Sequence, residues 1–232
     1  MSLPPADWVA ELPLDEDGGL ILPVPWEDGQ KASLPALLAT LGQILAHPRR
    51  FFASLPQSGG LADPLGFVFL VGTTGLLSLL LWQSVLEGAA AGPLPEGLVA
   101  AYLTALEGNP NLVFGLVLLT PLYVAFSQFI MSISLFWALR LVGPATTSFA
   151  AVFRVVAYAQ APAVLCLLPW VGGLAARVWH LALLGYGLSQ TLRLSTGKAL
   201  LSLFLAVLWL ALAFVLLLLL LGLLGLWRLL GS

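Results

Sequence analysis

The chain has 232 residues, of which 60% are hydrophobic and 9% charged, and its formal net charge is −2. An ordinary soluble domain has about 45–50% apolar and about 25% charged residues, so this is not the composition of a water-soluble fold. The slight negative charge argues against a nucleic-acid partner, which requires a basic surface. A single cysteine, Cys166, excludes a disulfide framework and a thiolate metal cage.

Residues 1–33 form an acidic, proline-rich segment that differs from the rest of the chain. It contains seven acids, one cation and five prolines. Such a composition buries too little apolar surface to offset its chain entropy, so we predict an extended or disordered cytoplasmic tail. Its apolar islands are Trp8, residues 20–22 and residues 24–26. They either fold back onto the protein or form a short docking motif for a partner.

Residues 34–53 have the apolar spacing of an amphipathic helix. Ser33 is the expected N-cap, and His47-Pro48 is expected to end the helix. The helix is too short to span a membrane. We therefore predict that it lies in the headgroup layer, where cations and aromatic rings gather. The predicted interfacial anchors are Arg49, Arg50, Phe51 and Phe52.

The remaining chain is dominated by long apolar stretches. From Gly108 to Ser232, 125 residues contain no aspartate or glutamate and only six cations. A hydrocarbon core of about 30 Å takes about 20 helical residues to cross, and charge is costly inside it. We therefore predict an all-α membrane domain over residues 65–227. Its five transmembrane helices are predicted at residues 65–86, 112–139, 149–168, 173–192 and 199–227.

Two prolines predict local features of these spans. Pro121 is expected to kink the second span. Pro162 weakens the third span and leaves a backbone carbonyl without its usual donor, for which Gln160 or Ser189 is the expected partner. A tight turn at residues 169–173 is expected to pair spans three and four as an antiparallel hairpin.

The distribution of cations predicts the direction of insertion. With the N-terminus in the cytoplasm, seven cations fall on or near the inner side, and only Arg177 and Arg228 fall outside. We therefore predict a multi-pass protein of the inner (plasma) membrane, with the N-terminus cytoplasmic and the C-terminus outside. In the outer loop, an apolar pattern from Pro95 to Leu106 predicts a short helix on the membrane surface.

Few polar side chains lie within the predicted spans, and they define the candidate site. Arg177 and His180 are three residues apart, hence on one face of span four. With Tyr158 and Gln160 of span three, they are candidates to hold an anionic lipid headgroup. Alternatively, Arg177 extends to the outer interface, bonds to backbone carbonyls or stacks on an aromatic ring such as Trp170.

Small residues predict where helices pack. Lipid supplies no hydrophobic drive between helices, so close packing depends on small side chains. Ala199, Ala206 and Ala213 repeat every seven residues on the fifth span and are the predicted packing positions. The leucine run from Leu216 to Leu221 is expected to face lipid.

The sequence contains no Ser-His-Asp set, phosphate-binding loop or zinc-ligand spacing. We therefore expect no enzyme, no cofactor and no metal site. The leading hypothesis is a membrane scaffold or adaptor that recruits a protein partner through the tail and the amphipathic helix, or organises lipid. The alternatives are a transporter or lipid-handling protein with a cavity among spans two to four, and an accessory subunit of a larger membrane complex. In each case we expect contacts with membrane lipids, and the sequence is compatible with an oligomer.

A series of residues in a fixed order resembles a known family. The C-terminal series is Tyr158, Ala161-Pro162, Leu165, Leu168-Pro169, Val171-Gly172, Trp179, Gly187-Leu188, Ser195 and Lys198-Ala199. It is preceded by Trp26-Glu27, His47-Pro48, Phe51-Phe52 and Pro64-Leu65. Over roughly residues 26–225 the chain resembles the Yip-type (Ypt/Rab-GTPase-interacting) membrane proteins, and the first part resembles their bacterial members.

The resemblance implies five packed helices and a cytoplasmic N-terminus. Eukaryotic members act in vesicle traffic between endoplasmic reticulum and Golgi and contact small GTPases. Their cytosolic Asp-Leu-Tyr-Gly-Pro-like motif is absent here, since residues 63–67 read Asp-Pro-Leu-Gly-Phe. The resemblance is therefore carried over to fold and topology, and not to that role.

Overall fold

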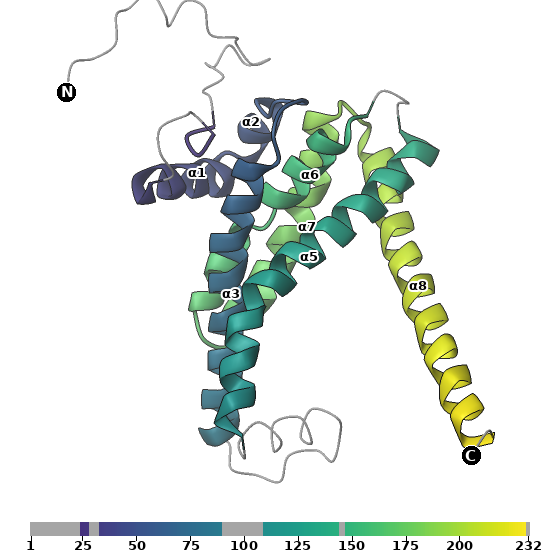
Figure 1. Cartoon of the computed structure of the whole chain (residues 1–232). Helices are drawn as coiled ribbons and strands as arrows, with labels where there is room; N and C mark the ends of the chain where they lie inside the picture. The colour runs from purple at the N-terminus through teal and green to yellow at the C-terminus, as the bar shows by residue number, and fades with distance from the viewer. Residues whose placement is uncertain (1–23, 28–32, 90–108, 144–146, 231–232) are drawn as a thin grey trace, which may run out of the picture.

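The computed structural model describes residues 24–27, 33–89, 109–143 and 147–230, and within these ranges all regular structure is helical (Figure 1). The elements in chain order are α1 (Leu34–Ala46), α2 (Pro48–Ala53), α3 (Ala62–Ala89), α5 (Pro110–Val142), α6 (Phe149–Tyr158), the 3-10 helix η2 (Ala161–Leu167), α7 (Gly172–Thr191) and α8 (Thr196–Leu230). The all-helical prediction is confirmed for this part of the chain. The predicted surface helix at Pro95–Leu106 and most of the acidic tail lie outside the described residues.

Four stretches of the described chain are long and apolar enough to cross a membrane. They are Ala62–Trp82, Val117–Val142, Phe149–Leu167 and Thr196–Leu223. The remaining predicted span, the fourth at residues 173–192, corresponds to α7, whose 20 residues at about 1.5 Å each reach about 30 Å, the thickness of a hydrocarbon core. Helix α7 is thus long enough to cross, but Arg177, His180 and Gln190 make it less apolar than the other four.

The arrangement of the helices fixes their relative directions. Figure 1 shows α3 running from the end of the bundle that holds α2 toward the opposite end, α5 returning, and α6 with η2 running away again. Helix α7 then returns to the end where α6 began, and α8 starts there. The third and fourth predicted spans, which are α6 with η2 and α7, therefore form the antiparallel hairpin that the tight turn at residues 169–173 predicts. Helix α5 contains Pro121 and changes direction along its length in Figure 1.

Helix α6 lies at the centre of the bundle. Its N-terminus is capped by Ser148, whose hydroxyl accepts a hydrogen bond from the Ala151 amide at 3.1 Å. Every residue from Ala151 to Tyr158 is buried, and helices α3, α5 and α7 all pack against α6. Because α6 is buried on all sides, its backbone holds the polar side chains described below in fixed positions.

The predicted amphipathic helix is two helices that meet at His47-Pro48. Ser33 caps α1, and Pro48 takes the first position of α2, where its missing amide costs nothing. Phe51 and Phe52 are buried in the core, rather than in the headgroup layer where the sequence predicted them. The reason is that α2 packs against α7, and the Thr191 hydroxyl donates to the Phe52 carbonyl at 2.7 Å.

Arg49 and Arg50, the other two predicted anchors, are exposed on α2. The Arg49 guanidinium lies over the Tyr186 ring, 5.6 Å from its centroid. Of the four predicted anchors, only the two cations are therefore placed where a headgroup could reach them.

Helix α8 contacts the bundle only through its first part. Ala199, Ser202 and Ala206 are buried against the bundle, and α8 packs against α5 and α7. Ala213 is exposed, unlike the first two alanines of the predicted seven-residue repeat. The reason is visible in Figure 1, where α8 diverges from the other helices toward the C-terminus. Leu216–Leu221 is exposed throughout, as a lipid-facing surface would be.

Candidate functional site

The break between α6 and η2 creates the first polar site. Past the break, the Ala163 amide bonds to the Gln160 carbonyl at 2.8 Å, one residue short of the α-helical partner. His180 Nδ1 lies 2.7 Å from the Ala159 carbonyl oxygen. The sequence predicted Gln160 or Ser189 for this kind of role, but the Ser189 hydroxyl donates to Gly185 of its own helix. Since a carbonyl only accepts, Nδ1 carries the proton, and Nε2 of a neutral His180 is left as an acceptor.

Three of the four predicted site residues line one pocket of about 310 Å³. They are Gln160, Arg177 and His180, and the pocket lies among α3, α5, η2 and α7. Gly72 and Gly75 of α3 and Ser127 of α5 are among the other residues that line it. The Arg177 guanidinium and the Gln160 amide can donate hydrogen bonds to an anionic lipid headgroup in this largely apolar pocket, whereas Nε2 of a neutral His180 can only accept.

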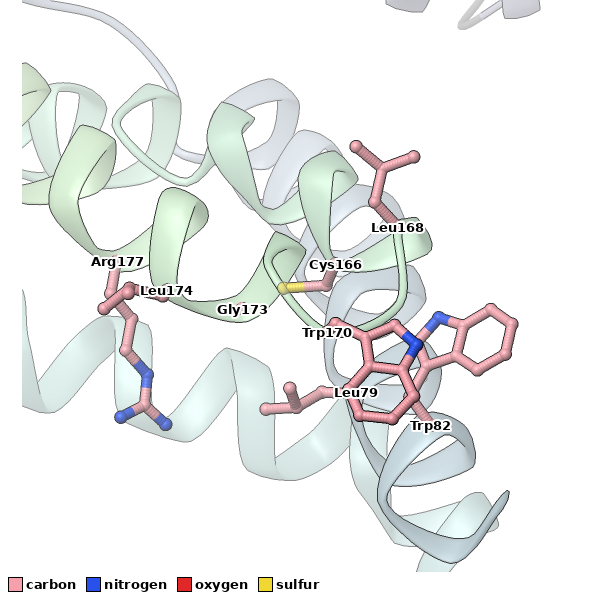
Figure 2. A pocket seen from close by; sticks show the side chains of 8 residues that line it. All are labelled: Leu79, Trp82, Cys166, Leu168, Trp170, Gly173, Leu174 and Arg177. Atoms are coloured by element: carbon pink, nitrogen blue, oxygen red, sulfur yellow. The ribbon is translucent and has the colours of Figure 1, made fainter. Parts of the chain in front are cut away.

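Arg177 also borders a second pocket of about 300 Å³, nearer the turn that precedes α7 (Figure 2). Trp82 and Trp170 line it, and the Trp82 indole donates to the Leu167 carbonyl at 3.2 Å. In Figure 2 the Arg177 guanidinium extends away from Trp170, so stacking on that ring, one of the alternatives for Arg177, does not occur. Arg177 is exposed, which leaves its guanidinium free to meet a ligand or a headgroup from outside the bundle.

Tyr158, the fourth predicted residue, belongs to a different cluster. Its hydroxyl donates to Glu27 Oε1 at 2.7 Å, and Arg154 Nε lies 3.1 Å from the same oxygen. Arg154 Nη2 donates to the Gly60 carbonyl at 2.9 Å. We call Glu27, Arg154, Tyr158 and Gly60 the Glu27 cluster. Arg154 and Tyr158 are four residues apart on α6 and so present their polar groups on one face.

The Glu27 cluster is closed by a short piece of the tail, Val24–Glu27, which we call the docked segment. The Glu27 amide bonds to the Val24 carbonyl at 2.9 Å, which forms a turn. Trp26 is 7% exposed; its amide donates to the Thr40 hydroxyl at 3.1 Å. The Trp26 indole donates to the Asp63 carbonyl at 2.6 Å. This island of the tail therefore folds back onto the protein.

Sequence reasoning missed the Glu27–Arg154 pair. The partners are 127 residues apart, and the composition of the tail favoured disorder. The available signal was local. Glu27 follows the apolar island Val24-Pro25-Trp26, and Arg154 and Tyr158 have helical spacing on the third predicted span.

These features define the class of the protein: a multi-pass α-helical membrane protein whose packed bundle includes an N-terminal docked segment. The Yip1 domain family matches the chain over residues 42–226, and the chain belongs to that family. No curated protein and no solved structure matches it. The docked segment precedes the matched region, so the family match covers Arg154 and Tyr158 but not Glu27.

Proposed function

We propose that the protein is a non-enzymatic scaffold of the inner (plasma) membrane that recruits a partner to its cytoplasmic face through the acidic tail. The observation that carries the proposal is the docked segment. Trp26 and Glu27 are held in the bundle by hydrogen bonds and an ion pair. This attachment tethers the preceding residues to the bundle.

The tether gives the acidic residues a defined reach. Asp7, Glu11, Asp15, Glu16 and Asp17 precede the docked segment. Asp17 lies seven residues before Val24, so even a fully extended chain keeps it within about 25 Å of the bundle. A partner with a basic surface would be steered toward these five carboxylates and held next to the membrane.

The test compares one full-length variant with the wild type. The variant replaces the five acids by their amides and keeps the docked segment. Site-specific photocrosslinkers placed in the tail identify what it contacts in cells. If the acidic tail recruits a partner, a specific protein is expected to crosslink to the wild-type tail and not to the tail of the amide variant. The same crosslinked proteins in wild type and amide variant would contradict the proposal.

A second function, lipid handling, is favoured by one observation: Gln160, Arg177 and His180 line a common pocket. A lipid phosphate held there would be retained through detergent extraction. Native mass measurement is then expected to show a bound anionic phospholipid in the wild type and its loss in Arg177→Gln. Lys198→Gln, which removes an exposed cation outside the pocket, is the matched control. Equal retention in all three proteins would contradict lipid handling at this pocket.

A further inference from the structure

The pocket of about 310 Å³ that Gln160, Arg177 and His180 line, which we call the His180 pocket, has a simple charge balance. Arg177 is its one cation when His180 is neutral, and no carboxylate is among the residues that line it. Helices α5, η2 and α7, which form most of its wall, contain no aspartate or glutamate at all. In a largely apolar setting, a single guanidinium without an acid favours a ligand that carries one negative charge.

The same pocket offers hydrogen-bond acceptors, which an anion alone cannot use. His180 Nδ1 donates to the Ala159 carbonyl at the end of α6, so Nε2 is directed away from α6 and can only accept. The Ser127 hydroxyl donates to the Val124 carbonyl of its own helix at 2.9 Å, which leaves its oxygen as an acceptor. Both side chains line the His180 pocket. A matching ligand therefore brings hydrogen-bond donors together with its negative charge.

Burial separates the donors of the pocket from these acceptors. Tyr123 and Arg177 are exposed and so mark the mouth of the pocket, where a hydroxyl and a guanidinium can donate to an anion. Ser127 and His180 are half-buried and lie further in. The arrangement suits an anion at the mouth that carries a hydroxylated group extending inward.

The second pocket, shown in Figure 2, adjoins the first at Arg177 and is mostly apolar. The residues common to both pockets are Leu79, Cys166, Gly173 and Arg177. The rest of its lining includes Trp82, Leu168 and Leu174. A ligand held at Arg177 can thus extend a polar group into the His180 pocket and an apolar chain along the second pocket. Sites for whole small molecules start at about 300 Å³, so the His180 pocket has room for a headgroup and not for a complete phospholipid.

We propose that the His180 pocket binds the headgroup of a phospholipid that is a phosphodiester monoanion with hydroxyl groups, the chemistry of phosphatidylglycerol. The phosphate accepts from Arg177 and Tyr123, and the glycerol hydroxyls donate to His180 Nε2 and the Ser127 oxygen. A phosphomonoester carries a charge of about −1.5 to −2 at pH 7, more than one guanidinium balances. An ammonium headgroup brings a cation for which the pocket has no carboxylate. The inference rests on lipid handling at this pocket and names the class of lipid.

Native mass measurement of the full-length protein in a neutral detergent tests the headgroup assignment, with lipids of identical acyl chains added in equal amounts. Phosphatidylglycerol is expected to be retained most. Phosphatidylethanol has the same charge but no hydroxyl group, and it is expected to bind about threefold to tenfold more weakly, which corresponds to one net hydrogen bond. Phosphatidic acid and phosphatidylethanolamine, which change the charge, are also expected to bind more weakly than phosphatidylglycerol.

Two variants remove the acceptors one at a time. Ser127→Ala deletes a hydroxyl that bonds within its own helix, so the fold is expected to be kept. Ser78→Ala is the matched control, because the Ser78 hydroxyl likewise bonds to a carbonyl of its own helix, that of Thr74 at 2.7 Å, and lines neither pocket. Ser127→Ala is expected to lower the preference for phosphatidylglycerol over phosphatidylethanol, and Ser78→Ala to leave it unchanged. His180→Asn keeps an N–H for Ala159 but lacks Nε2, and it is expected to behave like Ser127→Ala.

The outcomes separate this inference from lipid handling itself. Equal binding of phosphatidylglycerol and phosphatidylethanol by the wild type, or an unchanged preference in both Ser127→Ala and His180→Asn, would overturn the headgroup assignment. If lipid retention still depends on Arg177 in that case, lipid handling stands and only the assignment fails. If retention of no lipid depends on Arg177, both fail.

Discussion

At the residue scale, Arg154 and Glu27 show how a membrane bundle can accommodate a buried charge. The two side chains are 4% and 12% exposed, and removing either partner from such a pair leaves an uncompensated ion. The pair joins the centre of the bundle to the docked segment. Together with the hydrogen bonds of Trp26 to Thr40 and Asp63, it attaches the docked segment to the bundle.

The first prediction concerns the stability that this pair confers. Glu27→Gln is expected to lower the free energy of unfolding by up to about 3–5 kcal/mol, the range for breaking one half of a buried ion pair. Tyr158→Phe, which removes one hydrogen bond to the same carboxylate, is expected to cost about 0.5–3 kcal/mol. Unfolding in mixed micelles measures both, and a Glu27→Gln variant as stable as the wild type would contradict the assigned pair.

The sequence could not predict this contact, for a physical reason. Helical periodicity needs several turns to be recognised, and the docked segment has four residues. Its neighbours in the tail are acids and prolines, which favour disorder. Phe51 and Phe52 were misplaced for a similar reason, because the same mixture of arginine and phenylalanine occurs at a headgroup layer and at the edge of a core.

At the element scale, close approach of helices depends on a few small residues. A β-carbon at Gly187 of α7 would lie 2.6 Å from Val155 Cγ1 of α6 and 3.0 Å from the Phe52 ring of α2. At Gly185, two residues earlier on α7, no atom of the described residues outside the helix's own backbone would lie within 4 Å of such a β-carbon. These two glycines form a matched pair on one helix.

The second prediction uses that pair. Gly187→Ala is expected to destabilise the bundle by about 1–3 kcal/mol, because α6 or α2 must shift to admit the methyl group. Gly185→Ala is expected to be neutral or stabilising by up to about 1 kcal/mol, since alanine favours a helix more than glycine does. Thermal unfolding of the two variants in the same detergent compares them directly. Equal effects would show that the α7 packing described above is wrong.

The third prediction concerns the break between α6 and η2. His180→Phe fills the space of the ring but leaves the Ala159 carbonyl without its donor, which is expected to cost about 1–3 kcal/mol. His180→Asn retains an N–H and is expected to recover part of that loss. If both variants are as stable as the wild type, the hydrogen bond between His180 and Ala159 does not support the break.

Helix positions were the most predictable feature at this scale. Helices α3, α5, α6 with η2, α7 and α8 match the five predicted spans to within three residues at each end, because apolar runs and proline breaks are local signals. That all five cross the membrane stays a prediction. The departure of α8 from the bundle was not predictable. One face of α8 carries Ala199, Ala206 and Ala213. How far along this face α8 contacts the bundle depends on the paths of α5 and α7, which the sequence of α8 does not specify.

At the scale of the whole molecule, the directions of the helices constrain the number of crossings. Helices α6 and α8 begin at the same end of the bundle (Figure 1), so α6, η2 and α7 together leave that end and return to it. Five crossings result if this hairpin traverses the bilayer, and three if it enters and leaves on one side. The 35 residues of α8, at about 1.5 Å each, reach about 52 Å and exceed a hydrocarbon core of about 30 Å.

Four cations of the described residues gather at one end of the bundle, while the orientation of that end in the membrane stays a prediction. Helix α2, the end of α5 and the start of α8 lie at one end of the bundle in Figure 1, and they carry Arg49, Arg50, Arg140 and Lys198. Composition and cation counts could predict a membrane domain and this asymmetry, because both are sums over many residues. A partner depends on individual surfaces and could not be predicted in that way.

Labelling of a single cysteine at position 171 tests the five-span account most directly. Val171 is 66% exposed in the turn between η2 and α7, and Cys166→Ala gives a cysteine-free background. In intact cells or oriented vesicles, Val171→Cys is expected to react with a membrane-impermeant maleimide only from outside. Ser58→Cys, in the exposed loop between α2 and α3, is expected to react only from the cytoplasmic side. Reaction of both positions from one side, or shielding of position 171 from both sides, would contradict five crossings.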